Sequence, residues 1–256
     1  MPRIAAAVLF IISPAYGQTV DDLIAEGDSL WEALQPAAAI VPYAAALGRD
    51  QQRAEAWWKY ARSQVDVAKQ LVDDDDQEVR DSIYGIARAY AQSALNFDVD
   101  DADAHFVLAL VLGEQSRTRG GRERVQFAAE IYDEATKALA LNPEHDGAMH
   151  ILGAWHAEVR RLSGLTRFFA KTLFGGGFLD RANWDSATTH LERAVEIKPS
   201  YIFHRLELAR IYVDIDRPEK ALGQLEAIVP LAPIGDVLDP RHKAEAAKLE
   251  AELRSR

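Results

Sequence analysis

Histidines are the residues of this chain best suited to acid–base catalysis or metal binding, because imidazole titrates near neutral pH. The chain has seven histidines and no cysteine, which excludes thiol nucleophiles and cysteine-based metal sites. His145, His150 and His156 are spaced five and six residues apart, so the three cannot share one helical face. The sequence has no H-E-x-x-H motif, phosphate-binding glycine loop or G-x-S-x-G elbow. We therefore expect a protein that is not an enzyme, with no catalytic residues, metal or cofactor.

Two acidic runs could suggest a calcium site. The run Asp98–Asp103 (DVDDAD) lacks the central glycine and the late bidentate glutamate of a calcium loop. We assign it to a turn between helices. The run Asp73–Asp76 is expected to end one helix and open the next, since acidic residues favour a helix N-terminus.

One basic and apolar segment, RRLSGLTRFFAKTLFGGGF (160–178), contrasts with the acidic remainder of the chain. Its apolar residues from Leu165 to Phe174 follow helical spacing, and three glycines predict where the helix stops. Such a helix could be a permanently packed strut, could lie on an anionic membrane or lipid, or could dock on a protein. Its candidate contact residues are Arg161, Arg167, Phe168, Phe169 and Lys171.

The overall composition is that of a folded, acidic protein. The chain has 256 residues, 48% of them hydrophobic, and a formal net charge of −11. An acidic surface argues against nucleic acid as a partner, because phosphate binding needs a basic footprint. The acidic composition does not exclude peripheral contact of the one basic segment with a membrane.

The N-terminal residues 1–17 have the pattern of a signal peptide. Arg3 precedes a short apolar run, and Ala15 and Gly17 suit the small positions of a cleavage site. We therefore expect export, to the periplasm or the medium, with residues 18–256 as the mature domain.

A repeat of about 34 residues, the period of tetratricopeptide arrays, predicts the fold. Ala187 and Ala221 are separated by this period, and so are Leu191 and Leu225. Small residues at such positions are typical of the places where tetratricopeptide helices cross. Together with weaker upstream copies the repeat predicts an all-α solenoid of four or five helical pairs, closed by a polar capping helix over 241–254.

The basic segment is an insertion within one of these pairs. Gly153 precedes Ala187 by a whole period, whereas the equivalent Ala209 precedes Ala221 by only about a third of one. An insertion of roughly 22 residues therefore separates the two helices of the earlier pair. The preceding pair is also lengthened, by RTRGGRERV (117–125).

The insertion-bearing unit resembles the regulator of microtubule dynamics family. The helix motif H-x-L-G-x-W is present at His150–Trp155, and the following L-S-x-L turn at Leu162–Leu165. The likeness covers about 102–253. It implies a tetratricopeptide scaffold with a groove; eukaryotic members associate with microtubules or with mitochondrial membrane contacts, and one is described as binding phospholipid. An exported protein would not meet microtubules, so we expect only the scaffold and the groove to carry over.

The concave surface of a tetratricopeptide array is lined by the first helix of each pair. Applying the repeat phase to this chain places there Trp58, Phe106, Leu110, His150, Phe203, Leu206 and Arg210. This mostly apolar set suits a protein partner or, alternatively, a phospholipid or fatty acid held under the insertion. It is equally compatible with ordinary core packing, since aromatic stripes at helical spacing usually pack.

Overall fold

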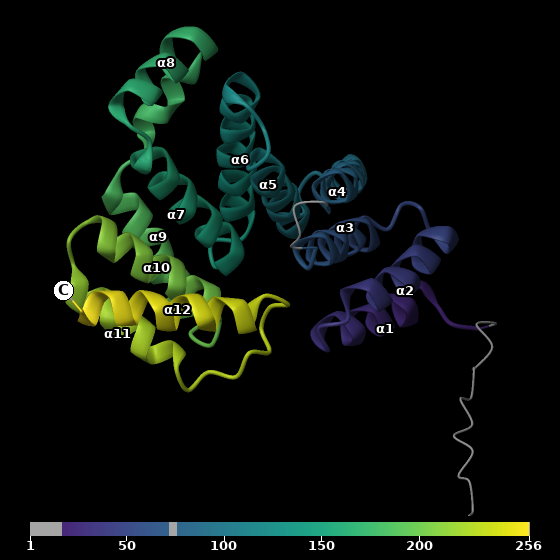
Figure 1. Cartoon of the computed structure of the whole chain (residues 1–256). Coiled ribbons are helices and arrows are strands. Elements are labelled where there is room, and N and C mark those ends of the chain that lie inside the picture. The colour runs from purple at the N-terminus through teal and green to yellow at the C-terminus, as the bar shows by residue number, and fades with distance from the viewer. Residues whose placement is uncertain (1–16, 72–75, 256) are drawn as a thin grey trace, which may run out of the picture.

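The computed structural model describes residues 17–71 and 76–255, and within them helix is the only regular secondary structure. Apart from Gly17, the predicted signal peptide lies outside the described residues, as do Asp73–Asp75. Figure 1 shows the helices arranged as an arch. They are α1 (Val20–Glu32), α2 (Pro36–Arg49), α3 (Ala54–Lys69), α4 (Gln77–Phe97), α5 (Ala102–Ser116), α6 (Gly121–Leu141), α7 (Asp146–Arg161), α8 (Gly164–Phe174), η2 (Gly176–Arg181), α9 (Trp184–Ile197), α10 (Ile202–Asp214), α11 (Pro218–Ile228) and α12 (Asp239–Arg254).

Five antiparallel pairs form the array, and α12 follows them. The pairs are α1/α2, α3/α4, α5/α6, α7/α9 and α10/α11, each packed on the next. This arrangement confirms the predicted tetratricopeptide solenoid, because each pair buries an apolar face that it could not cover alone. In the part of the chain that the structure describes, no helix combines the length and the apolar character needed to span a bilayer.

Local signals set the helix ends. The Thr19 hydroxyl accepts from the Asp22 backbone N–H, and the Asp22 carboxylate accepts from Thr19, which forms a capping box on α1. Pro36 and Pro218 occupy the first turn of α2 and α11, where a missing N–H is tolerated. Asp101 caps α5 through a 3.0 Å bond from the Ala104 N–H. The acidic run Asp98–Asp103 therefore forms a turn between pairs, as predicted.

Small residues allow the helices to approach closely. Ala187 and Ala221 are fully buried at equivalent positions of α9 and α11. Gly153 of α7 lies so near α9 that a Cβ atom there would overlap Cδ2 of Leu191. The close approach expected for Gly153 from the repeat phase is therefore confirmed.

The insertion forms α8 and the short helix η2, and both project from the α7/α9 pair (Figure 1). The Ser163 hydroxyl caps α8 by accepting from the Thr166 N–H, and Gly175 ends it in the left-handed conformation at φ 74°. Phe178 packs near Trp155, with ring centroids 6.2 Å apart, and Phe174 lies against Gly121 of α6. The lengthened turn before α6 thus supplies part of the seat for the insertion.

The last helix does more than cap the array. The polar helix predicted over 241–254 is present as α12, but it also lies against α10, the first helix of the last pair. The loop that leads into α12 reaches α3 near the other end of the arch, where Lys69 Nζ lies 3.9 Å from an Asp236 carboxylate oxygen.

Candidate binding surfaces

The outer face of α8 carries an exposed apolar stripe. Leu165, Phe169 and Leu173 are spaced four residues apart, which aligns them along one side of the helix. They are 66%, 47% and 65% exposed, and the neighbouring Phe168 is 58% exposed. Of the residues of α8 only Ala170 is buried. The insertion therefore packs against the array through its inner side, and no side chain within residues 17–71 and 76–255 covers its outer side.

A cationic cleft lies beside this stripe, between the end of α7, α8 and η2. Its volume is about 510 Å³, and its walls include Phe168 and Leu179 as well as charged side chains. Lys171 forms a 2.6 Å ion pair with Asp180 across the cleft. Arg160 and Arg167 also line it, and no acidic side chain of the described residues pairs with either. The Nε atom of Arg160 is buried without a hydrogen-bond partner, so one donor in this wall is unsatisfied.

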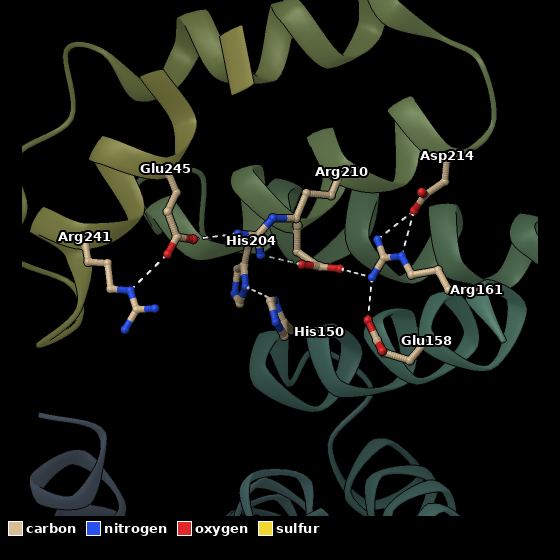
Figure 2. A network of polar contacts seen from close by, with 9 residues as sticks. His150, Glu158, Arg161, His204, Arg210, Asp214, Arg241 and Glu245 are labelled. Carbon is tan, nitrogen blue, oxygen red and sulfur yellow. Dashed lines mark hydrogen bonds and ion pairs between the residues drawn. The ribbon is translucent and has the colours of Figure 1, made fainter. Parts of the chain in front are cut away.

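Arg161 points away from this cleft, although we expected it among the insertion contacts. Its guanidinium forms ion pairs with Glu158 at 2.6 Å, Asp214 at 2.7 Å and Glu207 at 3.0 Å. Figure 2 shows Arg161 between Glu158 and Asp214. Burial alone would lower its pKa, but Glu207 and the other two carboxylates outweigh that effect and raise it. Arg161 thus ties α7 to α10 as a structural residue.

The residues predicted for the concave surface divide into two groups. Leu206 is fully buried in the core and cannot contact a ligand; Trp58 is also buried and donates its indole N–H to Asp101. Phe106, Leu110, His150, Phe203 and Arg210 are partly exposed. The rings of His150 and Phe203 meet, with centroids 4.6 Å apart.

The insertion does not cover this partly exposed group, contrary to the expected position of a roof over the groove. The main packing partners of α8 are η2 and α6. It is α12 that covers Phe203 and Arg210: His242 stacks on Phe203 with centroids 4.4 Å apart, and Glu245 pairs with Arg210 at 2.6 Å. Figure 2 shows Arg210 directed toward Glu245.

A histidine pair, in which His204 is buried and His150 partly exposed, joins α7 to α10. The Nδ1 atoms of His150 and His204 are 2.9 Å apart, and His204 Nε2 lies 2.9 Å from an Asp146 carboxylate oxygen. His204 therefore donates from Nε2 to Asp146 and accepts at Nδ1 from His150. Burial lowers the pKa of both histidines, so the pair is neutral near pH 7. No group of three or more histidine or acidic side chains suited to a metal occurs in the described residues.

Comparison with known proteins decides the family. Residues 20–254 match the family model described as regulator of microtubule dynamics protein 1-3. The chain belongs to this family. The match extends through the N-terminal pairs, beyond the region 102–253 on which the resemblance was based.

Curated relatives are longer than this chain. Regulator of microtubule dynamics protein 1 from Bos taurus is 27% identical over 174 residues, which cover 68% of this chain and 54% of the relative. The Mus musculus protein is 24% identical over 206 residues, 79% of this chain and 65% of the relative. This family member thus spans about half to two thirds of the length of these relatives.

Solved structures agree with the fold. A thermophilic tetratricopeptide protein, TTC0263 from Thermus thermophilus, superposes with a TM-score of 0.64 at 19% identity, covering 90% of this chain and all of that one. The pilF protein of Pseudomonas aeruginosa superposes with a TM-score of 0.55 at 16% identity, covering 91% and 89%. These likenesses establish the tetratricopeptide architecture alone.

Sequence reasoning missed the groups that close the arch, Lys69 and Asp236, because a single ion pair between distant segments leaves no local pattern. Sequence reasoning also did not identify Asp180 as a residue that lines the cleft. The three-residue spacing of Asp236, Asp239, His242 and Glu245 was the one available signal that this side of α12 faces a partner surface.

Proposed function

We propose that this protein is a non-enzymatic scaffold that binds a protein partner through the apolar stripe of α8 (Leu165, Phe169 and Leu173) and the neighbouring Phe168. The observation that supports this is the exposure of four large apolar side chains on one helix of 11 residues. Contiguous exposed apolar surface of this kind marks interaction sites in soluble proteins.

The chemistry of α8 indicates the kind of partner. Anchors at Leu165, Phe169 and Leu173 suit insertion of the helix into an apolar groove. Arg167 and Lys171 lie beside the stripe, and α8 contains no acidic residue, so the groove should have acidic rims. Charge complementarity of this type favours correct orientation and fast association.

Affinity purification with quantitative mass spectrometry tests this function. The variant Leu165→Ser/Phe169→Ser/Leu173→Ser should lose the specific partners that the wild-type chain recovers from its native extract. A matched control, Val41→Ser/Ile234→Ser, alters side chains that are 68% and 72% exposed elsewhere. The proposal is wrong if the α8 variant and the control recover the same partners as the wild-type chain.

The cationic cleft supports a second candidate, the binding of an anionic amphiphile such as a phospholipid or a fatty acid. Arg160 and Arg167 offer donors without acidic partners, and Phe168 and Leu179 offer apolar wall beside them. Charged donors of this type bind phosphate and carboxylate strongly.

Binding of a fluorescent anionic phospholipid would test the cleft. We expect Arg160→Gln/Arg167→Gln to weaken binding at least tenfold and Arg193→Gln, on exposed α9 surface, to leave it unchanged. Equal affinity in the cleft variant and the wild-type chain would refute this candidate.

We also propose export of the protein, on the basis of residues 1–17. The intact mass of protein purified from the exported fraction should correspond to a chain that begins after Gly17. Recovery of the full-length mass in that fraction would refute cleavage at this position.

A further inference from the structure

The side of α12 that faces the array presents acidic and aromatic groups at regular spacing. Asp236 precedes the helix, His242 follows six residues later, and Glu245 three residues after that. Residues three apart share one face of a helix. His242 and Glu245 therefore share one face of α12, and Asp236 adds a second acid from the loop before the helix.

Each of these groups meets a complementary group. The Tyr201 hydroxyl donates to Asp236 at 2.7 Å, and Lys69 lies 3.9 Å from the same carboxylate oxygen. The stacked rings of His242 and Phe203 are nearly parallel, at 10°.

The second acid, Glu245, accepts a 2.6 Å bond from Arg210, which also pairs with Glu207. Beneath the segment, the array thus offers a cation, an aromatic ring and a second cation in the same order as the groups of α12.

The array side of this contact belongs to the concave face. Phe203 and Arg210 lie on α10 and Lys69 ends α3, and both are first helices of their pairs. The Lys69 ammonium group is almost enclosed; burial lowers its pKa, but Asp66 and Asp236 together raise it, so it stays charged. Asp66 of the same helix already pairs with Lys69, at 3.4 Å. A second acid on the occupant compensates the burial of this charge further, because a charge in a poorly solvated place is costly.

The contact of α12 with the array buries few apolar side chains and leaves some polar atoms unsatisfied. Its buried residues are Asp239, His242 and Ala246, and only Leu249 and Leu253 add partly buried apolar packing. Two of its buried polar atoms, Oδ1 of Asp239 and Nδ1 of His242, have no hydrogen-bond partner. Unsatisfied buried polar atoms weaken a contact, and both atoms gain water when α12 leaves the array. A competing ligand therefore displaces this segment at a reduced cost.

We infer that the concave face of α3 and α10 is a binding site for an acidic helical peptide, occupied in the free protein by the chain's own residues 236–245. The ligand would carry a carboxylate, an aromatic side chain six residues later and a second carboxylate three residues beyond. This surface is separate from the α8 stripe, so either can fail its test without the other.

A peptide-binding experiment on the full chain tests this site. The probe is a fluorescein-labelled synthetic peptide of residues 232–254, and its binding is measured by anisotropy. The variant Asp236→Asn/Glu245→Gln removes both acids of the internal segment but leaves the array side intact. We expect it to bind the peptide at least tenfold more tightly than the wild-type chain, where α12 competes.

Matched variants define the controls. Glu250→Gln/Glu252→Gln also removes two acids from α12, but Glu250 pairs with Arg254 of the same helix and Glu252 is exposed. This control should bind the peptide no better than the wild-type chain. Arg210→Gln, combined with the substitutions of Asp236 and Glu245, should abolish the gained binding. Hydrogen exchange of α12 amides near its N-terminus should be accelerated in the Asp236/Glu245 variant and unchanged in the control.

Two results would overturn the inference. One is an unchanged exchange rate of α12 in the Asp236/Glu245 variant, which would show that these acids do not hold it. The other is accelerated exchange without peptide binding, which would show that the vacated surface is not a binding site. If this variant loses helical circular dichroism, the single substitution Glu245→Gln replaces it, with an expected gain of about threefold.

Discussion

Substituting Gly153 with alanine would test the closest helix approach in the array. The added methyl group would overlap Cδ2 of Leu191 and fall 3.1 Å from the Ala187 carbonyl oxygen. Leu191 is fully buried, so its side chain cannot move aside without disturbing the core. The backbone oxygen of Ala187 limits the alternative, which is a sideways shift of α7.

The magnitude follows from two opposed effects. Overpacking of a well-filled core costs about 1–3 kcal/mol, and an overlap with a buried side chain places Gly153→Ala at the upper end. Alanine in a helix interior is favoured over glycine by about 1 kcal/mol. The net loss in the free energy of unfolding is therefore about 2 kcal/mol, or about 4–8 °C in Tm for a chain of this size.

Gly85→Ala is the matched control, because Gly85 is also inside a helix, α4, and a Cβ atom there would meet nothing within 4 Å. It should gain about 0.5–1 kcal/mol. Urea unfolding followed by circular dichroism measures both variants. A Gly153→Ala protein as stable as Gly85→Ala would show that α7 and α9 are not in this close contact, and the reasoning would fail.

Three further perturbations address pH, the α8 stripe and the first pair. Burial and the neighbouring His190 lower the pKa of His156 to about 4, below the usual 6.5, so its contribution to stability is lost as the pH falls from about 6.5 to 4. His156→Leu should therefore reduce the fall in unfolding free energy between pH 7 and pH 5 by roughly 2 kcal/mol in urea titrations, and an unchanged fall would contradict this. Leu165→Ser/Leu173→Ser should change the free energy of unfolding, measured by thermal unfolding, by less than about 0.5 kcal/mol, because both side chains are exposed. A larger loss of stability would mean that the stripe packs against another part of the protein. Tyr43→Phe should cost about 1–2 kcal/mol in the same assay, since the buried hydroxyl donates to Asp28 at 2.7 Å; a neutral effect would argue against that bond.

Much of the fold was predictable because its determinants are local and repeated. The repeat spacing of Ala187 and Ala221 marks where paired helices cross, and both residues are buried as that period requires. Gly175 ends α8 by adopting a conformation that glycine tolerates better than other residues. The position of the insertion followed from the same register.

The orientation of the insertion was not predictable, for a physical reason. Helical spacing identifies the apolar stripe of α8 but does not tell whether a neighbouring element covers it. The stripe is exposed because Ala170 and Phe174, on another side of α8, form its seat. Likewise, the alternation of charge and alanine in 241–254 predicts a polar cap, but the aromatic contact of His242 with Phe203 depends on how α12 crosses α10.

The approach of the loop before α12 to the end of α3 has a consequence for how the array unfolds. In an open solenoid each repeat touches only its neighbours, so the terminal repeats fray independently and stability is nearly a sum of nearest-neighbour contributions. Here Tyr201, Asp236 and Lys69 connect the last pair to the second pair directly. Loss of the second pair or of the last pair removes contacts from the other, so cooperativity is expected from the second pair to the last rather than stepwise melting from the C-terminal end.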